Sequence, residues 1–380
     1  MTDYSTSNEI SMYQSVFTEN SLIEVPIASF SNNINQVLST IPKTRYYGSK
    51  RRLLDWIYQS TKDLPFNTVL DGFGGTASVS LLFKAMGKQV TFNDALLSNS
   101  IAAKALLSEK ASFNFNEATN FIDSITPVEG FISKTFEGMY YTQKENNWLD
   151  GAAKKINKVD DGLKRVTYLY CLFQACLMKR PFNLFHRANL NLRTNQNVKR
   201  SFGNYVTWET AFPVLMKARL NEILQFSSPS LQMVNVLSNG DIARLDPGYD
   251  LVYLDPPYLN QGSNSDDYLK RYHFLEGLSD YDNWENKINA ASTIKAINTN
   301  KFISDWQNKN TFKENLFNLV KKHNQSIVVL SYIANAYPSE KEITDCFKSN
   351  FDHVSVLRKD FCHALAKEKK IELLFIGRQK

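Results

Sequence analysis

The most constraining feature of the chain is a short apolar run that stops at an acid and two prolines. Residues Leu251 to Leu254 favour a β-strand, and the sequence Asp-Pro-Pro-Tyr follows at 255–258. Proline has no N–H for a sheet ladder and holds φ near a turn value, so the strand must end at Asp255. We therefore expect the Asp255 side chain at the carboxyl edge of a sheet, where open α/β sheets bind their ligands.

The residues at 255–258 suit chemistry on the exocyclic amine of an adenine. That amine has two N–H donors and a lone pair delocalised into the ring, so a site must accept both hydrogens before the nitrogen can attack a methyl group. Asp255 and the carbonyl of Pro256 can supply the two acceptors, and Pro257 fixes the turn. Tyr258 offers an aromatic face for a flipped base. The alternative is an ordinary edge strand with a proline turn, but the flanking apolar and aromatic residues favour the functional interpretation.

Length and composition place few limits on the fold and function of the chain. With 380 residues, of which 43% are hydrophobic, the chain can form one large domain with an insertion, or two domains. No apolar run approaches the ~18 residues of a membrane span, and the amino terminus has no basic-then-apolar leader, so we expect a cytoplasmic protein. The four cysteines lack metal-ligand spacing, so no metal site is expected.

A glycine-rich turn follows an earlier strand-like run. The run at 68–71 ends in Asp71, and Gly-Phe-Gly-Gly follows before a helical pattern resumes. Three glycines within four residues let the backbone pass close beneath a ligand, and the next helix presents free N–H groups there. The spacing matches neither the dinucleotide fingerprint nor a P-loop. We expect a nucleotide-like ligand at this turn.

Four other residues complete a candidate ligand site. Asp94 ends the next strand-like run, about 20 positions after the glycine turn, where a ribose hydroxyl pair is usually held. Asp241 follows a third run and suits the amino group of a bound purine. Near the amino terminus, Tyr46 and Lys50 are placed to flank a ligand that has a ring and a carboxylate. The alternative for that segment is a basic helix start on the surface.

Seven strand-like runs alternate with helical segments, which predicts an α/β fold. They lie at 68–71, 89–93, 232–237, 251–254, 326–331, 353–357 and 371–376. The last two are joined by a short charged connection and could pair as an antiparallel hairpin. Between about 107 and 231 the sheet pattern is absent, and we expect an inserted, largely helical unit there.

The insertion contains a long stretch without acidic residues. From Gly162 to Trp208 there is no Asp or Glu, while basic, aromatic and amide side chains alternate. Lys and Arg can neutralise phosphates, and Asn, Gln and Arg can bind base edges. A solvated basic face is the alternative, but the composition favours contact with nucleic acid. The candidate DNA-binding residues are Lys179, Arg180, Asn183, Arg187, Arg193, Lys199 and Arg200.

Together these motifs resemble the Dam-like, or α-group, class of DNA adenine-N6 methyltransferases. The resemblance runs from about Arg45 to the carboxyl end, with cofactor motifs first, the insertion next and the catalytic motif after it. It implies a seven-stranded Rossmann-like methyltransferase sheet with an antiparallel last strand, a target-recognition insertion, S-adenosylmethionine as methyl donor and double-stranded DNA as substrate. The expected divisions are an N-terminal extension at 1–43, a catalytic domain at 44–110 and 231–380, and an inserted DNA target-recognition domain at 111–230.

The resemblance also implies roles for individual residues. The expected catalytic residues are Asp255, Pro256, Pro257 and Tyr258. The expected cofactor-binding residues are Tyr46, Gly48, Lys50, Asp71, Phe73, Gly75, Asp94 and Asp241. One departure is Ala77, which stands where the family usually has the last glycine of its loop. Its methyl group would matter if the backbone there needs a positive φ.

The expected reaction is direct in-line transfer of a methyl group to N6 of a flipped adenine, by the modification enzyme of a restriction-modification system. A cognate restriction endonuclease would then be a functional rather than a stable partner, and the protein would associate with the prokaryotic nucleoid through DNA. The alternatives are an orphan regulatory adenine methylase, a cytosine-N4 methyltransferase, or a non-catalytic DNA-binding subunit with this fold. The cytosine enzymes usually have Ser where Asp255 stands, which favours adenine. A related proline motif serves methylation of protein side-chain amides, but that function would not explain the basic insertion.

Overall fold

The computed structural model of the chain describes residues 39–42, 44–46, 48–109, 113–199, 202–226, 234–236, 240–260, 267–362 and 369–380. Most of the predicted N-terminal extension at 1–43 lies outside these ranges, as does the candidate DNA-binding residue Arg200. None of the helices within the described ranges is long and apolar enough to cross a membrane.

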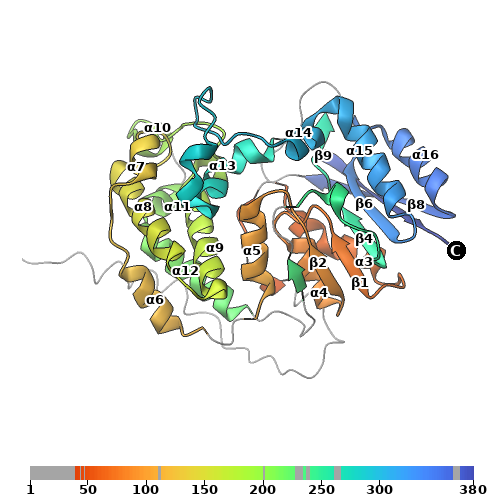
Figure 1. The fold of residues 1–380 in the computed structure, drawn as a ribbon, viewed down its shortest axis with the longest axis horizontal. Coiled ribbons are helices and arrows are strands. Elements are labelled where there is room, and N and C mark those ends of the chain that lie inside the picture. Colours follow the sequence, from red (N-terminus) through yellow and green to blue (C-terminus); the bar gives the residue numbers. More distant parts are fainter. Residues whose placement is uncertain are drawn as a thin grey trace, which may run out of the picture.

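A central sheet organises the fold (Figure 1). Its strand order is β3-β2-β1-β4-β6-β9-β8, with bounds Thr68–Asp71 for β1, Gln89–Phe92 for β2, Val234–Val236 for β3, Leu251–Leu254 for β4, Ile327–Ile333 for β6, His353–Cys362 for β8 and Lys369–Arg378 for β9. The first five in this order pair in parallel, whereas β9 lies antiparallel between β6 and β8. The predicted α/β class, the antiparallel last strand and the pairing of the last two strands are confirmed.

The helices fill the intervals between these strands. Their bounds, with 3-10 helices written η, are η1 Lys50–Leu53, α3 Leu54–Thr61, α4 Ser78–Ala85, α5 Leu97–Leu107, α6 Phe115–Asp123, α7 Phe131–Thr135, α8 Gln143–Asn157, α9 Gly162–Met178, η2 Pro181–Asn183, α10 Asn191–Thr194, α11 Phe202–Glu209, α12 Phe212–Gln225, η3 Ile242–Arg244, α13 Tyr268–Ser279, η4 Tyr281–Asn283, η5 Glu285–Lys287, α14 Lys301–Gln307, α15 Lys309–Lys322 and α16 Glu340–Asn350.

Strand register brings two predicted acids to one edge of the sheet. Val69 of β1 lies opposite Leu251 of β4, and Asp71 lies opposite Tyr253. All four residues of β4 are buried, as is usual for a parallel strand covered by helices on both faces. Asp71 and Asp255 therefore leave neighbouring strands at the same carboxyl edge.

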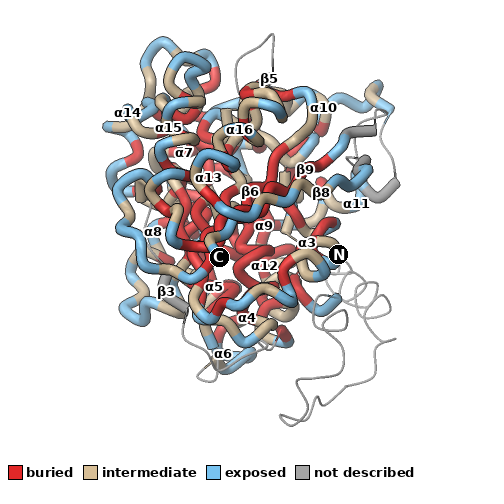
Figure 2. The backbone as a smooth tube through the Cα atoms, turned by 90° about the vertical axis from the view of Figure 1, so that its right-hand side faces the viewer, coloured by how far each residue is buried: buried red, intermediate tan, exposed pale blue. Residues whose placement is uncertain are grey.

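The two faces of the sheet belong to two separate apolar cores. Val69 and Tyr253 pack into one core with α3, α4, α5 and the helices of the insertion. Leu70 and Val252 point the other way and pack against α15 and α16. This division follows from the alternation of side chains along a strand. Figure 2 shows buried backbone running through the interior along β6 and α9.

The described residues between β2 and β3 form only helices, α5 to α12. α9 is the buried centre of this layer, and it packs against α5, α8 and α12. α13 follows the catalytic stretch in sequence, yet it packs against α5 and α9 beside the insertion (Figure 1). The backbone N–H of Phe185 donates to the carbonyl of Arg271 on α13, at 2.9 Å. The helical layer therefore includes a segment from outside residues 111–230.

A small second sheet, which the sequence did not predict, forms directly after the catalytic stretch. β5 (Leu259–Asn260) pairs antiparallel with β7 (Ala336–Tyr337). The Tyr258 ring also packs edge-on against Tyr332 of β6, with 5.2 Å between ring centroids. These contacts fix the direction in which the chain leaves residues 255–258.

Candidate active site

A cavity of about 180 Å³ lies at the carboxyl edge of β1 and β4. It gathers most of the predicted site residues from segments that are far apart in the sequence. Those that line it are Tyr46, Gly48, Lys50, Phe73, Gly75, Asp94, Asp255, Pro256, Pro257 and Tyr258. Asp71 lines a smaller hollow that shares Tyr46, Lys50 and Asp255 with the main cavity.

Asp255 is the centre of a buried polar cluster. The Lys50 ammonium lies 2.9 Å from its Oδ1, and the Tyr258 hydroxyl lies 3.1 Å from the same oxygen. Glu372 of β9 accepts from the Tyr258 hydroxyl at 2.7 Å and lies 3.2 Å from the Lys50 ammonium. Lys50 also donates to the Tyr258 hydroxyl. The described residues provide no hydrogen bond to Oδ2 of Asp255, so that oxygen can accept from a ligand.

The charges in this cluster oppose one another. The pKa of Asp255 is raised to about 6. Burial is the largest cause of this increase, Lys50 opposes it, and the nearby Glu372 adds to it. Burial acts to lower the pKa of Lys50, but Asp255 and Glu372 outweigh burial, and the net pKa is raised. Lys50 is therefore a permanent cation near neutral pH, and Asp255 is mainly ionised there.

The glycine turn that follows β1 is hydrogen-bonded to Asp94, which lies just after β2. The N–H of Gly75 donates to Oδ2 of Asp94 at 2.9 Å, and the N–H of Leu96 donates to Oδ1 at 2.8 Å. Asn99 also donates to Oδ1, at 3.0 Å. Burial raises the pKa of Asp94, although these hydrogen bonds lower it in part. A Cβ added at Gly74 would meet the ring of Phe92 at 2.1 Å, so the turn must be glycine there.

Tyr46 and Gly48 form one wall of the cavity together with α13. The Tyr46 ring stacks on Tyr272 with 4.2 Å between centroids, and Asn99 donates to its hydroxyl at 3.1 Å. Gly48 has a φ of +86°, and a Cβ there would meet the Tyr268 hydroxyl at 2.6 Å. Glycine at 48 is thus required by backbone conformation and by space.

Asp71 is an almost fully buried carboxyl group beneath the cavity. Its Oδ2 accepts from the Ser80 hydroxyl at 2.6 Å. Burial raises the pKa of Asp71 to about 7; the Ser80 hydrogen bond opposes this, and Asp255 and Asp94 add to it. Asp71 therefore favours a positively charged ligand.

Asp241 is the one predicted cofactor residue that lines neither hollow. Its side chain caps η3 by accepting from the N–H of Ala243 at 3.0 Å. The next residue, Ile242, packs over Gly72 of the glycine turn. The role expected for Asp241 at a purine amino group stays a prediction.

Ala77 adopts the backbone conformation that a glycine would favour. Its φ is +59°, in the left-handed region, and its side chain is fully buried at the start of α4. A residue with a Cβ pays about 1–2 kcal/mol in that region. The helix start therefore carries strain that the family's usual glycine would avoid.

Several cavity residues were missed by the sequence analysis. Glu372, Asn99, Tyr268, Trp306 and Gln307 also line the cavity. Glu372 stands next to the apolar run Leu373 to Ile376, and an acid at the start of such a strand was the available signal. The other four lie on helices with no motif that marks them.

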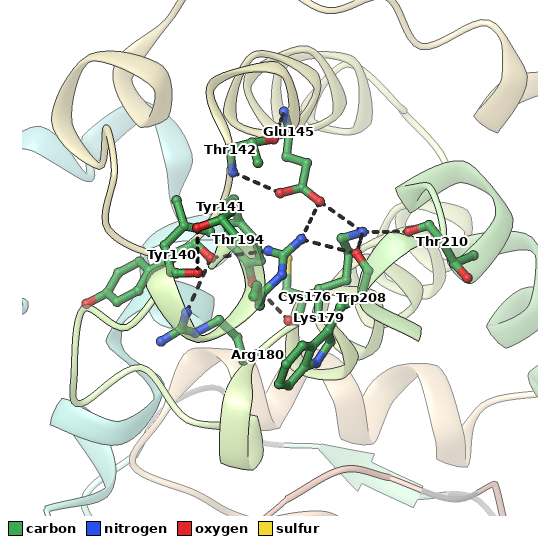
Figure 3. A network of polar contacts seen from close by, with 12 residues as sticks. Tyr140, Tyr141, Thr142, Glu145, Cys176, Lys179, Arg180, Thr194, Trp208 and Thr210 are labelled. Atoms are coloured by element: carbon green, nitrogen blue, oxygen red, sulfur yellow. Dashed lines mark hydrogen bonds and ion pairs between the residues drawn. The ribbon is translucent and has the colours of Figure 1, made fainter. Parts of the chain in front are cut away.

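The structure places the predicted basic residues in two different environments. Lys179, Arg180 and Arg193 are buried, and each makes polar contacts inside the helical layer. Figure 3 shows Lys179 and Arg180 among their partners. Glu145 of α8 lies 2.9 Å from the Lys179 ammonium and 2.7 Å from the Arg193 guanidinium. Arg180 donates to backbone carbonyls, including that of Tyr140 at 3.2 Å. We therefore correct the expectation for these three: their side chains are not available to a phosphate.

The remaining basic candidates lie at the surface. Arg187 and Lys199 are exposed, and Asn183 is partly exposed. The acid-free stretch thus mixes structural cations with surface cations, because Glu145, which pairs two of them, lies outside that stretch. Contact of Asn183, Arg187 and Lys199 with DNA stays a prediction.

Comparison with known proteins gives this geometry a family. Residues 46–353 match the model of the D12 class N6 adenine-specific DNA methyltransferases. The Type II methyltransferase M2.HphI of Haemophilus parahaemolyticus is 25% identical over 348 residues, covering 88% of this chain and 97% of that protein. The Type II methyltransferase M.FokI of Planomicrobium okeanokoites is 27% identical over 334 residues; the match covers 80% of this chain and 47% of M.FokI.

Among solved structures, the crystal structure of magnesium protoporphyrin IX methyltransferase from Synechocystis PCC 6803 with bound SAM aligns over 98% of this chain and 92% of its own. Its TM-score is 0.30 at 9% identity. The family match confirms the predicted adenine-N6 class. The chain belongs to the D12 class of N6 adenine-specific DNA methyltransferases, which use S-adenosylmethionine as the methyl donor.

Proposed function

We propose that this protein methylates N6 of an adenine flipped out of duplex DNA, as the modification enzyme of a type II restriction-modification system. The observation that carries the proposal is that Asp255 and Pro256 both line the cavity, while the described residues occupy only Oδ1 of Asp255. The names of the two relatives, both type II methyltransferases, support the restriction-modification role. A cognate restriction endonuclease is then the functional partner.

The residues of the site fit a positively charged, nucleoside-containing cofactor. Four carboxylates, Asp71, Asp94, Asp255 and Glu372, line the two hollows, and Lys50 is the one cation among the lining residues. This excess of negative charge favours the sulfonium of S-adenosylmethionine. Asp94 would hold the ribose hydroxyls, and Phe73, whose ring packs edge-on against Trp306 at 4.9 Å, would contact the base. Tyr46, Gly48 and Gly75 would border the remaining parts.

The chain's own residues prepare the amine for attack. Oδ2 of Asp255 and the Pro256 carbonyl accept one N6 hydrogen each, which localises the nitrogen lone pair and lets the nitrogen become tetrahedral. The bound cofactor supplies an electrophilic methyl group on sulfur, and its transfer is in-line and direct. The methylated nitrogen is then positively charged and gives one proton to the Asp255 carboxylate, which leaves neutral N6-methyladenine. With a pKa of about 6, Asp255 is mainly ionised at neutral pH and can serve as acceptor.

An exposed aromatic residue lies in the same chain segment as Asn183 and Arg187. Phe182 is 63% exposed with a φ of +60°, and Asn183 follows with a φ of +57°. Two consecutive residues in the left-handed region cost stability, and such strain concentrates at functional segments. The contact between Phe185 and Arg271 holds this segment against α13, and the first residues of α13 line the cavity. We infer that Phe182 stacks on a base near the cavity, and that Arg187 and Lys199 contact phosphates.

The test is nucleoside analysis of DNA treated with the purified protein. We expect N6-methyladenine, and sequencing of the methylated DNA then gives the recognition sequence. Asp255→Ala should abolish methylation and leave cofactor binding measurable by titration. Near-normal turnover in this variant, or N4-methylcytosine as the product, would contradict the proposal. Glu340→Gln, which removes a carboxylate paired with Arg358 on the far edge of the sheet, is the control.

A further inference from the structure

Glu372 is a buried acid that the reaction described above does not use. It is 3% exposed and lies on β9, next to the apolar residues Leu373 and Leu374. Its Oε1 receives the Ser331 hydroxyl at 2.7 Å and the Tyr258 hydroxyl at 2.7 Å, and it lies 3.2 Å from the Lys50 ammonium. Three polar groups from three other segments therefore converge on one oxygen.

A second acid at this place has an electrostatic cost. Lys50 alone would neutralise Asp255, so Glu372 leaves the cluster with one cation for two carboxylates. A buried carboxylate needs full hydrogen bonding and a partner charge to be tolerated. Glu372 receives both only by sharing Lys50 with Asp255. Burial of a second acid is difficult to explain by stability and points to a role in the site.

The geometry of the cluster indicates what that role is. The single hydroxyl proton of Tyr258 can serve only one carboxylate at a time, and the distance to Glu372 (2.7 Å) is shorter than that to Asp255 (3.1 Å). The Lys50 ammonium has three donors on a flexible stem. Without Glu372, that ammonium would be free to bridge both oxygens of Asp255. Oδ2 would then no longer be open to the target amine.

We propose that Glu372 is a positioning residue, which holds the Lys50 ammonium and the Tyr258 hydroxyl on the Oδ1 side of Asp255 and so reserves Oδ2 for the N6 amine. Ser331 orients Glu372 from β6. The inference rests on the proposed function, because it assumes that N6 of adenine binds at Oδ2.

The experiment compares Glu372→Gln with the wild-type enzyme in steady-state methylation. Glutamine keeps the size and a hydrogen-bond acceptor but loses the charge that holds Lys50. We expect kcat to fall about 10- to 100-fold, since hydrogen bonds to charged groups are lost. The KM for DNA should stay within about twofold, because Glu372 does not touch DNA in this proposal. The kcat is measured at saturating S-adenosylmethionine, so the loss of one of the four carboxylates that favour the sulfonium does not enter it. The control Glu340→Gln should keep the wild-type kcat.

The pH profile separates positioning from packing. Glu372 raises the pKa of Asp255, so its removal should shift the acid limb of kcat to lower pH, even as the plateau falls. In a Tyr258→Phe background, Glu372→Gln should cost less than in the wild type, because part of its effect passes through the Tyr258 hydroxyl. A packing defect alone would move neither the acid limb nor this coupling.

Ser331→Ala keeps the Glu372 charge and removes only the hydroxyl that orients it, so it serves if Glu372→Gln folds poorly. We expect a loss in kcat of about 2- to 10-fold with unchanged KM values. Wild-type kcat in both variants, or a loss in Glu372→Gln that only follows the folded fraction while Ser331→Ala stays normal, would overturn the inference alone. Absence of N6-methyladenine from the wild-type reaction would overturn the proposed function and the inference with it.

Discussion

The Lys50 ammonium lies 2.9 Å from Oδ1 of Asp255, and both side chains are largely buried. Lys50 begins η1 near the amino terminus, whereas Asp255 directly follows β4 late in the chain. The contact therefore joins the first segment of the catalytic fold to the catalytic stretch. Its electrostatic effect is to lower the pKa of Asp255 against the effect of burial.

Replacing Lys50 with methionine should inactivate the enzyme at neutral pH. Methionine keeps most of the apolar side chain but removes the cation, so only the Tyr258 hydrogen bond still opposes burial and Glu372, and the pKa of Asp255 should rise above about 6. More of the carboxyl group is then protonated at pH 7, and the protonated form is a weaker acceptor for the N6 hydrogen and cannot take up its proton. We expect kcat at pH 7 to fall on the order of 100-fold.

The pH dependence of kcat in Lys50→Met tests this account. The acid limb should move to higher pH, opposite in direction to that of Glu372→Gln, so activity should recover partly at alkaline pH. An acid limb at the wild-type position would show that Lys50 acts by some other means.

Asp71→Asn should stabilise the protein at alkaline pH and weaken cofactor binding. Because burial raises the pKa of Asp71 to about 7, the stability that the protonated form contributes is complete below about pH 4 and is lost as pH rises to about 7. Asparagine removes that loss, which amounts to at most about 4 kcal/mol. Urea denaturation at pH 8 should show the gain in the free energy of unfolding, and at pH 4 the two proteins should be alike.

The exposed Asp63 provides the matched control, since Asp63→Asn should change neither pH dependence nor binding. Titration with S-adenosylmethionine should show a weaker Kd for Asp71→Asn at pH 8, because the ionised carboxylate that favours the cation is gone. Equal free energies of unfolding at pH 8 would contradict the assigned pKa.

The sequence predicted the ends of strands better than the environment of charges. Asp71, Asp94 and Asp255 were predicted correctly to line the site. The signals that mark them, which are prolines, glycines and the end of an apolar run, are all local in the sequence. Glu372 was missed because its partners Lys50 and Tyr258 come from distant segments, and no spacing rule connects them. Local patterns therefore predicted the catalytic edge of the sheet. They could not predict that Glu372 lies there, because its position depends on the pairing of β9 with β6.

Lys179 and Arg193 were predicted wrongly to bind DNA, again because a long-range partner was not visible in the sequence. A composition window counts their charges, but the Glu145 carboxylate that binds both belongs to another helix. The placement of α13 in the helical layer is likewise a tertiary contact, because its sequence follows the catalytic stretch. Long-range contacts, and not local propensity, determine the environments of Lys179 and Arg193 and the position of α13.

Glu145→Gln should destabilise the helical layer. Burial raises the pKa of Glu145, but Arg193 and Lys179 outweigh it and hold the pKa below its usual value, so the carboxylate is ionised at neutral pH. Its removal leaves two buried cations without a counter-charge, which costs on the order of 3 kcal/mol. Thermal denaturation should show the loss. Glu117→Gln, which breaks the exposed pair with Lys164, should cost at most about 1 kcal/mol, and a similar loss in both variants would argue against a structural role for the buried network.

Phe182→Gly should weaken DNA binding without weakening the fold. Glycine adopts the φ of +60° at no steric cost, and the phenyl ring it removes is 63% exposed, so the free energy of unfolding should stay the same or rise slightly. If the ring stacks on a base, its loss costs about 1–3 kcal/mol in DNA binding. The affinity for S-adenosylmethionine should be unchanged.

Arg187→Ala distinguishes stacking from phosphate contact on the same surface. A lost phosphate contact should reduce the slope of log Kd against log salt concentration by about 1, whereas Phe182→Gly should weaken binding at every salt concentration and leave that slope unchanged. Fluorescence of 2-aminopurine at the target position reports base flipping, and its increase on binding should be smaller in Phe182→Gly than in Arg187→Ala. If Phe182→Gly binds and flips DNA as the wild type does, the strained left-handed conformation at this segment has no part in DNA recognition.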